Sequence, residues 1–213
     1  MDDIVIVDFG MGNCWSVQNA LNFLGLKSKI SQDNEKIINS KCLILPGVGS
    51  FKKAMLKIKE MKIDKAMNES IKKNSKILGI CLGMQLLGSY SEEDGESEGL
   101  NLVNNRVDIV TKNKEIKIPH VGFNSVKIPS NSLLFNNIDN ESDFYFNHSY
   151  CMSEKLALKN TSTCVYGKTF VASFEGKNIF GTQFHPEKSQ TNGLLLLKNF
   201  FSLYTNVKKK NYF

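Results

Sequence analysis

The feature that most constrains this sequence is the stretch from residue 76 to 85, in which an apolar run ends at a glycine and a cysteine follows one residue later. The pattern Gly79-Ile-Cys81-Leu-Gly83 predicts a buried strand that turns abruptly into a helix, because the glycines permit a tight turn. Such an elbow holds the residue at its tip in a strained conformation at the edge of a sheet. A cysteine there lies at a helix N-terminus, whose partial positive charge favours the thiolate. Cys81 is therefore a candidate nucleophile, and the chain a candidate acyl-transfer enzyme.

Strands and helices alternate in the first half of the chain. Apolar, β-branched runs at 3–9 and 41–45 are typical of buried parallel strands, and a shorter strand is expected at 27–31. Apolar residues at helical spacing predict a helix over 17–24 and one long, lysine-rich amphipathic helix over 51–72. This alternation predicts an α/β fold, a three-layer sandwich with a mostly parallel central sheet.

The second half of the chain is rich in strands, which predicts an antiparallel C-terminal half. The expected strands are 106–111, 125–128, 143–148, 163–166, 170–174 and 178–184. Glu175-Gly-Lys-Asn178 reads as a hairpin turn, the acidic stretch 91–99 as an exposed loop, and 191–203 as a closing helix. The sequence shows no repeat, linker or second core, so one domain over 1–213 is expected, ending in a frayed, solvated segment at 208–213.

Composition excludes several functional classes. The 213 residues are 41% hydrophobic and 23% charged, which is ordinary for a globular protein. The net charge of +6 is scattered, with one cluster at Lys208-Lys-Lys210, so no nucleic-acid partner is expected. No apolar run approaches the roughly 18 residues that cross a bilayer, and Met-Asp-Asp does not begin a signal peptide. We expect a soluble, cytoplasmic protein without a membrane partner.

The cysteines argue against a metal centre. They number five, an odd count, and form no Cys-x-x-Cys pair, which speaks against a disulfide framework or a zinc site and for a reducing compartment. Gly10-x-Gly12 lacks the third glycine of a dinucleotide-binding loop. No metal and no cofactor are therefore expected.

A cysteine nucleophile needs a base and a group that orients the base, and the chain has only three histidines. His185 ends an expected strand, where α/β folds place their chemistry, and Glu187 follows two residues later across a proline. His120 and His148 lie in glycine- or hydroxyl-containing sequence and have no carboxylate at that offset. They are interpreted as hydrogen-bonded loop histidines.

At this point a family resemblance emerges. Gly-Ile-Cys81-Leu-Gly-Met-Gln85 and Gln-Phe-His185-Pro-Glu187 resemble class I (triad-type) glutamine amidotransferases, which hydrolyse glutamine to glutamate and ammonia. Within that family the chain is most similar to the glutaminase subunits of imidazole glycerol phosphate synthase, in histidine biosynthesis. The further motifs that carry the resemblance are Met11-Gly-Asn13, Pro46-Gly-Val-Gly-Ser-Phe51, Pro119-His-Val-Gly-Phe-Asn124, His148-Ser-Tyr150 and His185-Pro-Glu-Lys-Ser189.

The resemblance implies roles for individual residues. Cys81 would attack the carboxamide of L-glutamine and form a thioester, with His185 as base and then acid, and Glu187 orienting His185. The oxyanion hole would take one N–H from Leu82 and another from Val48 or Gly49. The glycines beside Val48 make a peptide flip there easy, so a partner could switch the hole. The substrate's amino and carboxylate groups would be held by Gly49, Gln85 and the backbone of Ser149 and Tyr150.

The resemblance also implies a partner, because free ammonia is lost to solvent unless an acceptor enzyme is docked. That partner would be a (β/α)8-barrel cyclase or synthase subunit, forming a heterodimer. Its docking face would include Asn13, Trp15, His120, Phe123, Asn124 and Lys188.

Three alternatives to this assignment are considered. Trp15, Val121 and Phe123 differ from the residues common in that subfamily, and a paralogous glutaminase that feeds amidine formation in surface-sugar or nonulosonic acid biosynthesis would fit as well. A cysteine peptidase or a non-catalytic binding subunit of similar fold fits less well. A peptidase would place its histidine soon after the nucleophile, and a dead subunit would lack a member of the triad.

Overall fold

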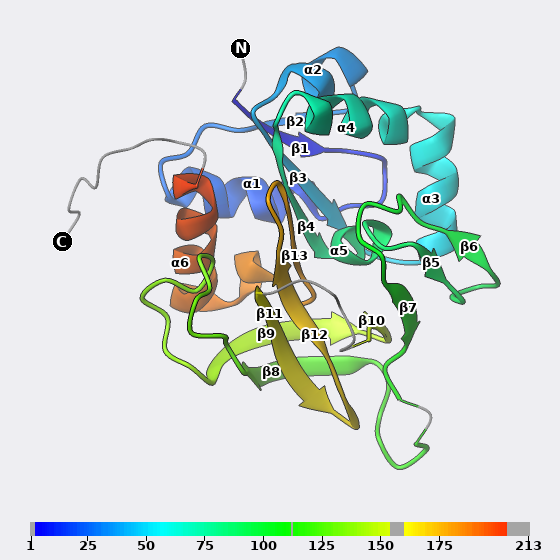
Figure 1. The fold of residues 1–213 in the computed structure, drawn as a ribbon, viewed down its shortest axis with the longest axis vertical. Helices are drawn as coiled ribbons and strands as arrows, with labels where there is room; N and C mark the ends of the chain where they lie inside the picture. The colour runs from blue at the N-terminus through cyan, green and yellow to red at the C-terminus, as the bar shows by residue number, and fades with distance from the viewer. Residues whose placement is uncertain (1–2, 112, 154–159, 204–213) are drawn as a thin grey trace.

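A seven-stranded sheet forms the centre of the molecule (Figure 1). The structure is a computed structural model that describes residues 3–111, 113–153 and 160–203. In sheet order the strands are β11 (Asn160–Tyr166), β12 (Lys168–Glu175), β13 (Ile179–Thr182), β4 (Lys76–Cys81), β3 (Cys42–Gly47), β1 (Ile4–Val7) and β2 (Lys29–Ser31). Strands β13, β4, β3, β1 and β2 run parallel to one another. Strand β12 pairs antiparallel with β13, and β11 pairs antiparallel with β12. This confirms the predicted mostly parallel sheet with antiparallel C-terminal strands, and the β12–β13 hairpin at the expected turn.

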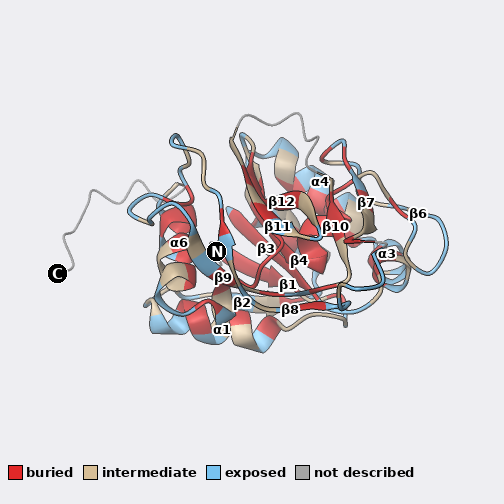
Figure 2. Cartoon of the chain, turned by 90° about the horizontal axis from the view of Figure 1, so that it is seen from below, coloured by how far each residue is buried: buried red, intermediate tan, exposed pale blue. Residues whose placement is uncertain are grey.

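Alternating side chains of the central strands divide the core into two clusters. Ile4 and Ile6 of β1 face one cluster, with α1 (Cys14–Phe23) and α6 (Gln190–Ser202), whereas Val5 and Val7 face the other. The second cluster is covered by α2 (Asn34–Asn39), α3 (Phe51–Glu60) and α4 (Ile63–Lys72). Figure 2 shows the buried sheet between helices whose outer faces are exposed. The three-layer arrangement follows from strands that are apolar on both faces.

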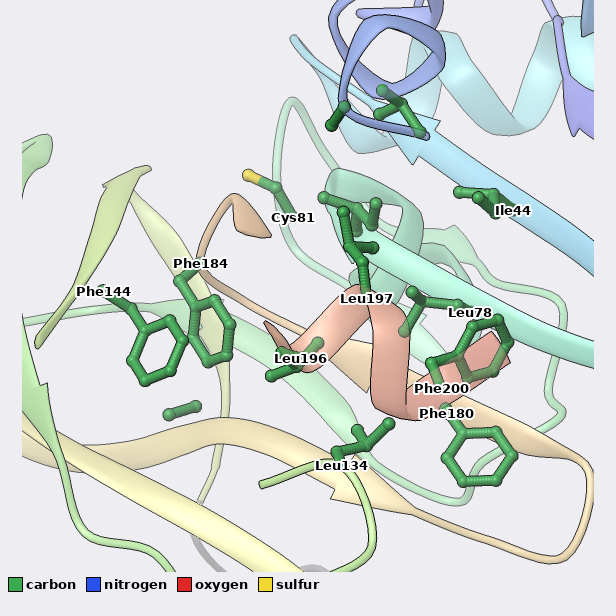
Figure 3. Close-up of a cluster of buried hydrophobic side chains, with 14 of the residues drawn as sticks. Ile44, Leu78, Cys81, Leu134, Phe144, Phe180, Phe184, Leu196, Leu197 and Phe200 are labelled. Atoms are coloured by element: carbon green, nitrogen blue, oxygen red, sulfur yellow. The ribbon is translucent and has the colours of Figure 1, made fainter. Parts of the chain in front are cut away.

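The first cluster ends at the candidate nucleophile. Figure 3 shows Leu78, Phe180 and Phe200 packed beneath the sheet, with Cys81 at the border of the cluster. The sulfur is thus carried by a strand whose preceding residues are fixed in the core.

The long helix predicted over 51–72 is wrong, because the chain breaks it at Lys62, which takes a left-handed conformation with φ 58°. The buried residues Phe51, Ala54 and Ile58 lie on one stripe of α3, but Ile63 follows five residues after Ile58. Five residues turn a helix by about 500°, which leaves the two stripes about 140° out of phase. A straight helix could not bury both stripes against one sheet.

Two smaller sheets complete the second half. One has the order β10 (Tyr150–Met152), β7 (Arg106–Ile109), β5 (Tyr90–Ser91) and β6 (Ser97–Glu98), so the predicted acidic loop begins and ends in short strands. The other pairs β8 (His120–Val126) with β9 (Ser142–His148). His120 lies directly opposite His148 in that ladder. The loop interpretation of these two histidines is therefore wrong. The predicted solvated end at 208–213 lies outside the described residues.

Candidate active site

The predicted elbow is present at the junction of β4 and α5 (Leu82–Leu86). Cys81 has φ 54° and ψ −110°, an unfavourable conformation for a residue with a side chain. Glycines make the junction possible: a Cβ on Gly83 would lie 1.7 Å from the carbonyl oxygen of Leu45, and one on Gly79 would lie 2.7 Å from Gly83 O. The strand and helix can approach this closely only without side chains at these two positions.

The predicted base and its orienting partner meet beside the elbow. Nδ1 of His185 lies 2.8 Å from Oε1 of Glu187, and the side chains are 3% and 1% exposed. The 3₁₀ turn Pro186–Lys188 returns Glu187 to the imidazole. Ser189 Oγ donates to the carbonyl of His185 (2.7 Å), which fixes the turn from inside.

The electrostatics of this pair favour a proton on the imidazole. Burial lowers the pKa of His185, but its interactions with Cys81 and Glu187 outweigh burial and raise that pKa to about 10. The imidazolium is therefore stabilised next to the sulfur. A histidine whose protonated form is stabilised in this way can take the proton of a thiol neighbour and then give it to a leaving group.

The sulfur of Cys81 has two further contacts. Sγ lies 3.7 Å from the carbonyl oxygen of Asn147 in β9, which accepts the thiol proton, and 3.8 Å from Nε2 of Gln183, which donates to it. The same strand also contacts the base, because His185 N donates to Tyr145 O (2.9 Å). The sulfur of Cys81 and the backbone of His185 are thus both held against the backbone of β9.

A cavity of about 450 Å³ opens above the sulfur. It is lined by Val48, Gly49, Ser50, Cys81, Leu82, Gln85, Glu93, Pro119, Asn147, His148, Ser149, Tyr150, His185 and Lys188. The catalytic pair Cys81 and His185 and every residue expected to form the oxyanion hole or bind substrate lie on its wall. Glu187 stands behind His185 instead, as an orienting group should.

Glu93 is a cavity residue that the sequence did not single out. Its Oε2 accepts the N–H of Phe51 at the start of α3 (2.8 Å), and burial raises the pKa of its carboxyl group. The acidic stretch is expected to be an exposed loop, and nothing in its sequence distinguishes this glutamate from its neighbours. Its inward orientation depends on a residue 42 positions away.

In the loop expected to complete the oxyanion hole, the N–H of Val48 is already used in another hydrogen bond. The N–H of Val48 donates to the carbonyl of Met11, at 3.1 Å. Gly49 has φ 98°, a conformation that glycine adopts readily. Leu82 is the first residue of α5, so its N–H has no acceptor within the helix.

Most of the residues expected at the docking face are near the surface or the cavity. Trp15 is 72% exposed and Phe123 49%, and Lys188 borders the cavity with Nζ 5.8 Å from the ring centroid of Tyr145. Asn13 precedes α1, and Asn124 donates from Nδ2 to Val165 O (3.3 Å).

His120 does not fit the expected docking face. It is 2% exposed and is stacked between Phe146 and Tyr166, with ring centroids 4.8 and 4.0 Å away. The interface expectation for its side chain is therefore wrong, because neighbouring aromatic rings cover both of its faces.

Comparison with known proteins decides the family. The glutamine amidotransferase class-I family matches residues 5–203. The chain belongs to this family. Imidazole glycerol phosphate synthase subunit HisH 1 of Parasynechococcus marenigrum is 46% identical over 97% of this chain and 100% of its own length. HisH of Moorella thermoacetica is 43% identical over 95% and 96%, and HisH 1 of Campylobacter jejuni 42% over 94% and 100%.

Solved structures of this amidotransferase fold superpose over nearly the whole chain. A putative GMP synthase component from Thermoplasma acidophilum matches with a TM-score of 0.72 and 22% identity, covering 97% of this chain and 95% of that one. PurLQS from Thermotoga maritima also gives 0.72, with 17% identity over 95% and 99%. No helix among residues 3–111, 113–153 and 160–203 has the length and apolar character needed to cross a membrane.

Proposed function

We propose that this amidotransferase is the glutaminase subunit of an imidazole glycerol phosphate synthase, a single cytoplasmic domain that hydrolyses L-glutamine to glutamate and ammonia. The observation that carries the proposal is that the strained Cys81 elbow and His185 lie on the wall of one cavity, with the buried Glu187 bound to His185 from behind. The relatives at 42–46% identity, all named as HisH subunits, support the pathway.

The chemistry follows from the three side chains. His185 takes the thiol proton, and the sulfur of Cys81 attacks the side-chain carbonyl carbon of glutamine to give a tetrahedral oxyanion. When the C–N bond breaks, His185 gives its proton to the departing ammonia and a thioester remains. Water then attacks the thioester with His185 as base, which releases glutamate and restores the thiol. Glu187 stabilises the imidazolium in both halves of the cycle.

Polar groups on the cavity wall match the amino-acid end of glutamine. Gln85 uses Nε2 for Tyr150 O (2.7 Å) and Gln183 Oε1 (3.1 Å), so toward a ligand it offers its amide oxygen, an acceptor that suits an α-ammonium. The carboxylate of Glu93, on the same wall, adds a negative charge opposite to that of the α-ammonium group. The backbone of Gly49, Ser149 and Tyr150 would bind the α-carboxylate.

The oxyanion hole is proposed to be completed only when a partner docks. Leu82 N–H is the first donor, and Val48 becomes the second when its peptide turns away from Met11 O. Gly47 and Gly49 flank that peptide and make the turn inexpensive. Met11 belongs to the loop that leads to the exposed Trp15, which gives a docked protein direct access to this hydrogen bond.

The outer face of the β8–β9 ladder is the proposed docking face. Val121 and Phe123, 57% and 49% exposed, lie opposite Asn147 and Tyr145, and the patch continues to Lys188 at the cavity mouth. Isolated exposed side chains are common, but this apolar pair borders the site that releases ammonia. A (β/α)8-barrel cyclase seated there would form a heterodimer and receive the ammonia before it reaches solvent.

The test is glutamine hydrolysis by the chain alone and with its cyclase partner. We expect slow hydrolysis alone, faster hydrolysis in the complex, and none in Cys81→Ala, which still binds the partner. Hydrolysis retained by Cys81→Ala would refute the mechanism, and full activity without a partner would refute the switch. Capture of an amidine-forming sugar synthase in place of the cyclase would refute the pathway.

Docking can be tested on its own by calorimetry. Phe123→Ser should weaken binding of the cyclase by about tenfold or more, as loss of a central aromatic does. Phe23→Ser is the matched control, since Phe23 is 79% exposed on α1. Equal effects of the two substitutions on binding would show that the β8–β9 face is not part of the interface.

A further inference from the structure

An unbroken chain of hydrogen bonds runs from the buried His120 to the sulfur of Cys81. Nδ1 of His120 lies 3.1 Å from Nε2 of His148, and Nδ1 of His148 lies 2.9 Å from the carbonyl oxygen of Tyr150. The chain continues through Gln85 to Gln183, whose Nε2 lies 3.8 Å from Sγ. These contacts join β8, β9, α5 and the residue that follows β13.

The carbonyl of Tyr150 sets the direction of every bond in this chain, because a carbonyl oxygen only accepts. His148 must therefore carry its proton on Nδ1, which leaves Nε2 to accept from Nδ1–H of His120. Gln85 must likewise present Nε2 to the same carbonyl, and its second N–H goes to Oε1 of Gln183. The amide of Gln183 then has one orientation, with its N–H groups toward the sulfur.

Gln183 is placed for a role at the sulfur. It is fully buried, and its backbone N–H donates to Ala172 O (2.8 Å), which fixes the start of the side chain. When the thiol proton leaves Asn147 O for His185, the sulfur becomes an anion and still faces the Gln183 N–H. Hydrogen bonds to charged groups are stronger than those to neutral ones, so this contact strengthens as the nucleophile forms.

Resting on the glutaminase proposed above, we infer that Gln183 is a fourth catalytic residue, which donates an N–H to the Cys81 thiolate in an orientation imposed by Gln85 and the Tyr150 carbonyl. His185 controls where the proton goes. Gln183 controls how stable and how well aimed the resulting anion is.

Two substitutions separate this role from a structural one. Gln183→Glu keeps an oxygen for Gln85 but replaces the N–H facing the sulfur with a second oxygen. Gln183→Met keeps the length of the side chain and removes both hydrogen bonds. Thr182→Val is the matched control, because Thr182 precedes Gln183, is buried, and has an Oγ1 without a partner among the described residues.

The experiment measures the rate of iodoacetamide alkylation against pH, with Cys81→Ala as the blank and peptide mass mapping of the labelled cysteine. The pH midpoint of Cys81 alkylation should rise by about one to two units in both Gln183 variants, as expected for loss of a charge-assisted hydrogen bond, and stay unchanged in Thr182→Val. The kcat for glutamine should fall about tenfold or more in both variants. The KM should stay near the parent's in Gln183→Glu, which preserves the contact with Gln85.

A midpoint equal to the parent's in a folded Gln183→Glu or Gln183→Met protein overturns the inference. If Gln183→Met does not fold, as judged by circular dichroism, Gln183→Glu decides the matter. Labelling of a cysteine other than Cys81 refutes the proposed nucleophile instead. Because alkylation needs neither glutamine nor a partner, the two failures are distinguishable.

Discussion

Burial of His120 and His148 should make the protein lose stability in mild acid, and His148 allows the loss to be calculated. Burial, together with nearby positive charge from His120 and His185, lowers its pKa to about 3 against 6.5 for a free side chain, whereas its bond to Tyr150 O acts in the opposite direction. The folded state therefore keeps His148 neutral where the unfolded chain binds a proton. Its contribution to stability is fully present above pH 6.5 and is lost as the pH falls toward 3.

Between pH 6.5 and pH 5 the free energy of unfolding contributed by His148 falls by about 1.36 kcal/mol per pH unit over about 1.5 pH units, or about 2 kcal/mol in all. Asp and Glu side chains titrate mostly below this window. His185 acts with the opposite sign, since its raised pKa gives stability that is greatest below pH 6.5 and declines toward pH 10. That contribution is common to parent and variant and cancels in their difference.

Urea denaturation of the parent and of His148→Asn at pH 7, 6 and 5 tests this calculation. Circular dichroism is the suitable probe, because Trp15, the single tryptophan, is 72% exposed and reports poorly on the core. The variant should be less stable at pH 7 but should lose about 2 kcal/mol less than the parent on going to pH 5. Equal losses in the two proteins would show that His148 is not held neutral by the fold.

Two further substitutions probe the elbow and the base. Gly83→Ala would place a Cβ 1.7 Å from Leu45 O and should cost about 3 kcal/mol or more in urea melts, whereas Gly25→Ala, with φ 72° and nothing within 4 Å, should cost about 1–2 kcal/mol. Equal costs would mean that β3 and α5 can separate freely. Glu187→Gln removes the charge 2.8 Å from His185 Nδ1 and should lower kcat for glutamine about 10³–10⁴-fold with little change in KM. A decrease of less than tenfold would place Glu187 outside the machinery.

The elbow and the central sheet were predictable because their signals are local. An apolar run, a glycine at a set offset and a cysteine between glycines specify the Cys81 turn without reference to the rest of the chain. The break at Lys62 was missed although its signal is also local, since the five-residue step from Ile58 to Ile63 does not fit one helical stripe.

The other features that were missed depend on contacts between distant residues. His120 and His148 become partners only because β8 and β9 pair in one register, across 28 residues. Glu93 enters the cavity through the amide of Phe51, which lies far away in the chain. A single sequence contains the residue types but not the register that brings them together.

Strand β9 separates the proposed docking face from the reacting atoms by the thickness of one peptide chain. The side chains of Tyr145 and Asn147 share the outer face with Phe123 and Val121, while their carbonyl oxygens touch His185 N and Cys81 Sγ. A protein bound to that face could therefore change the position of the nucleophile directly through β9, without any rearrangement of the core. A small shift of this strand would move His185 and the sulfur of Cys81 together, so binding strength and turnover should prove hard to change independently by substitutions on β9.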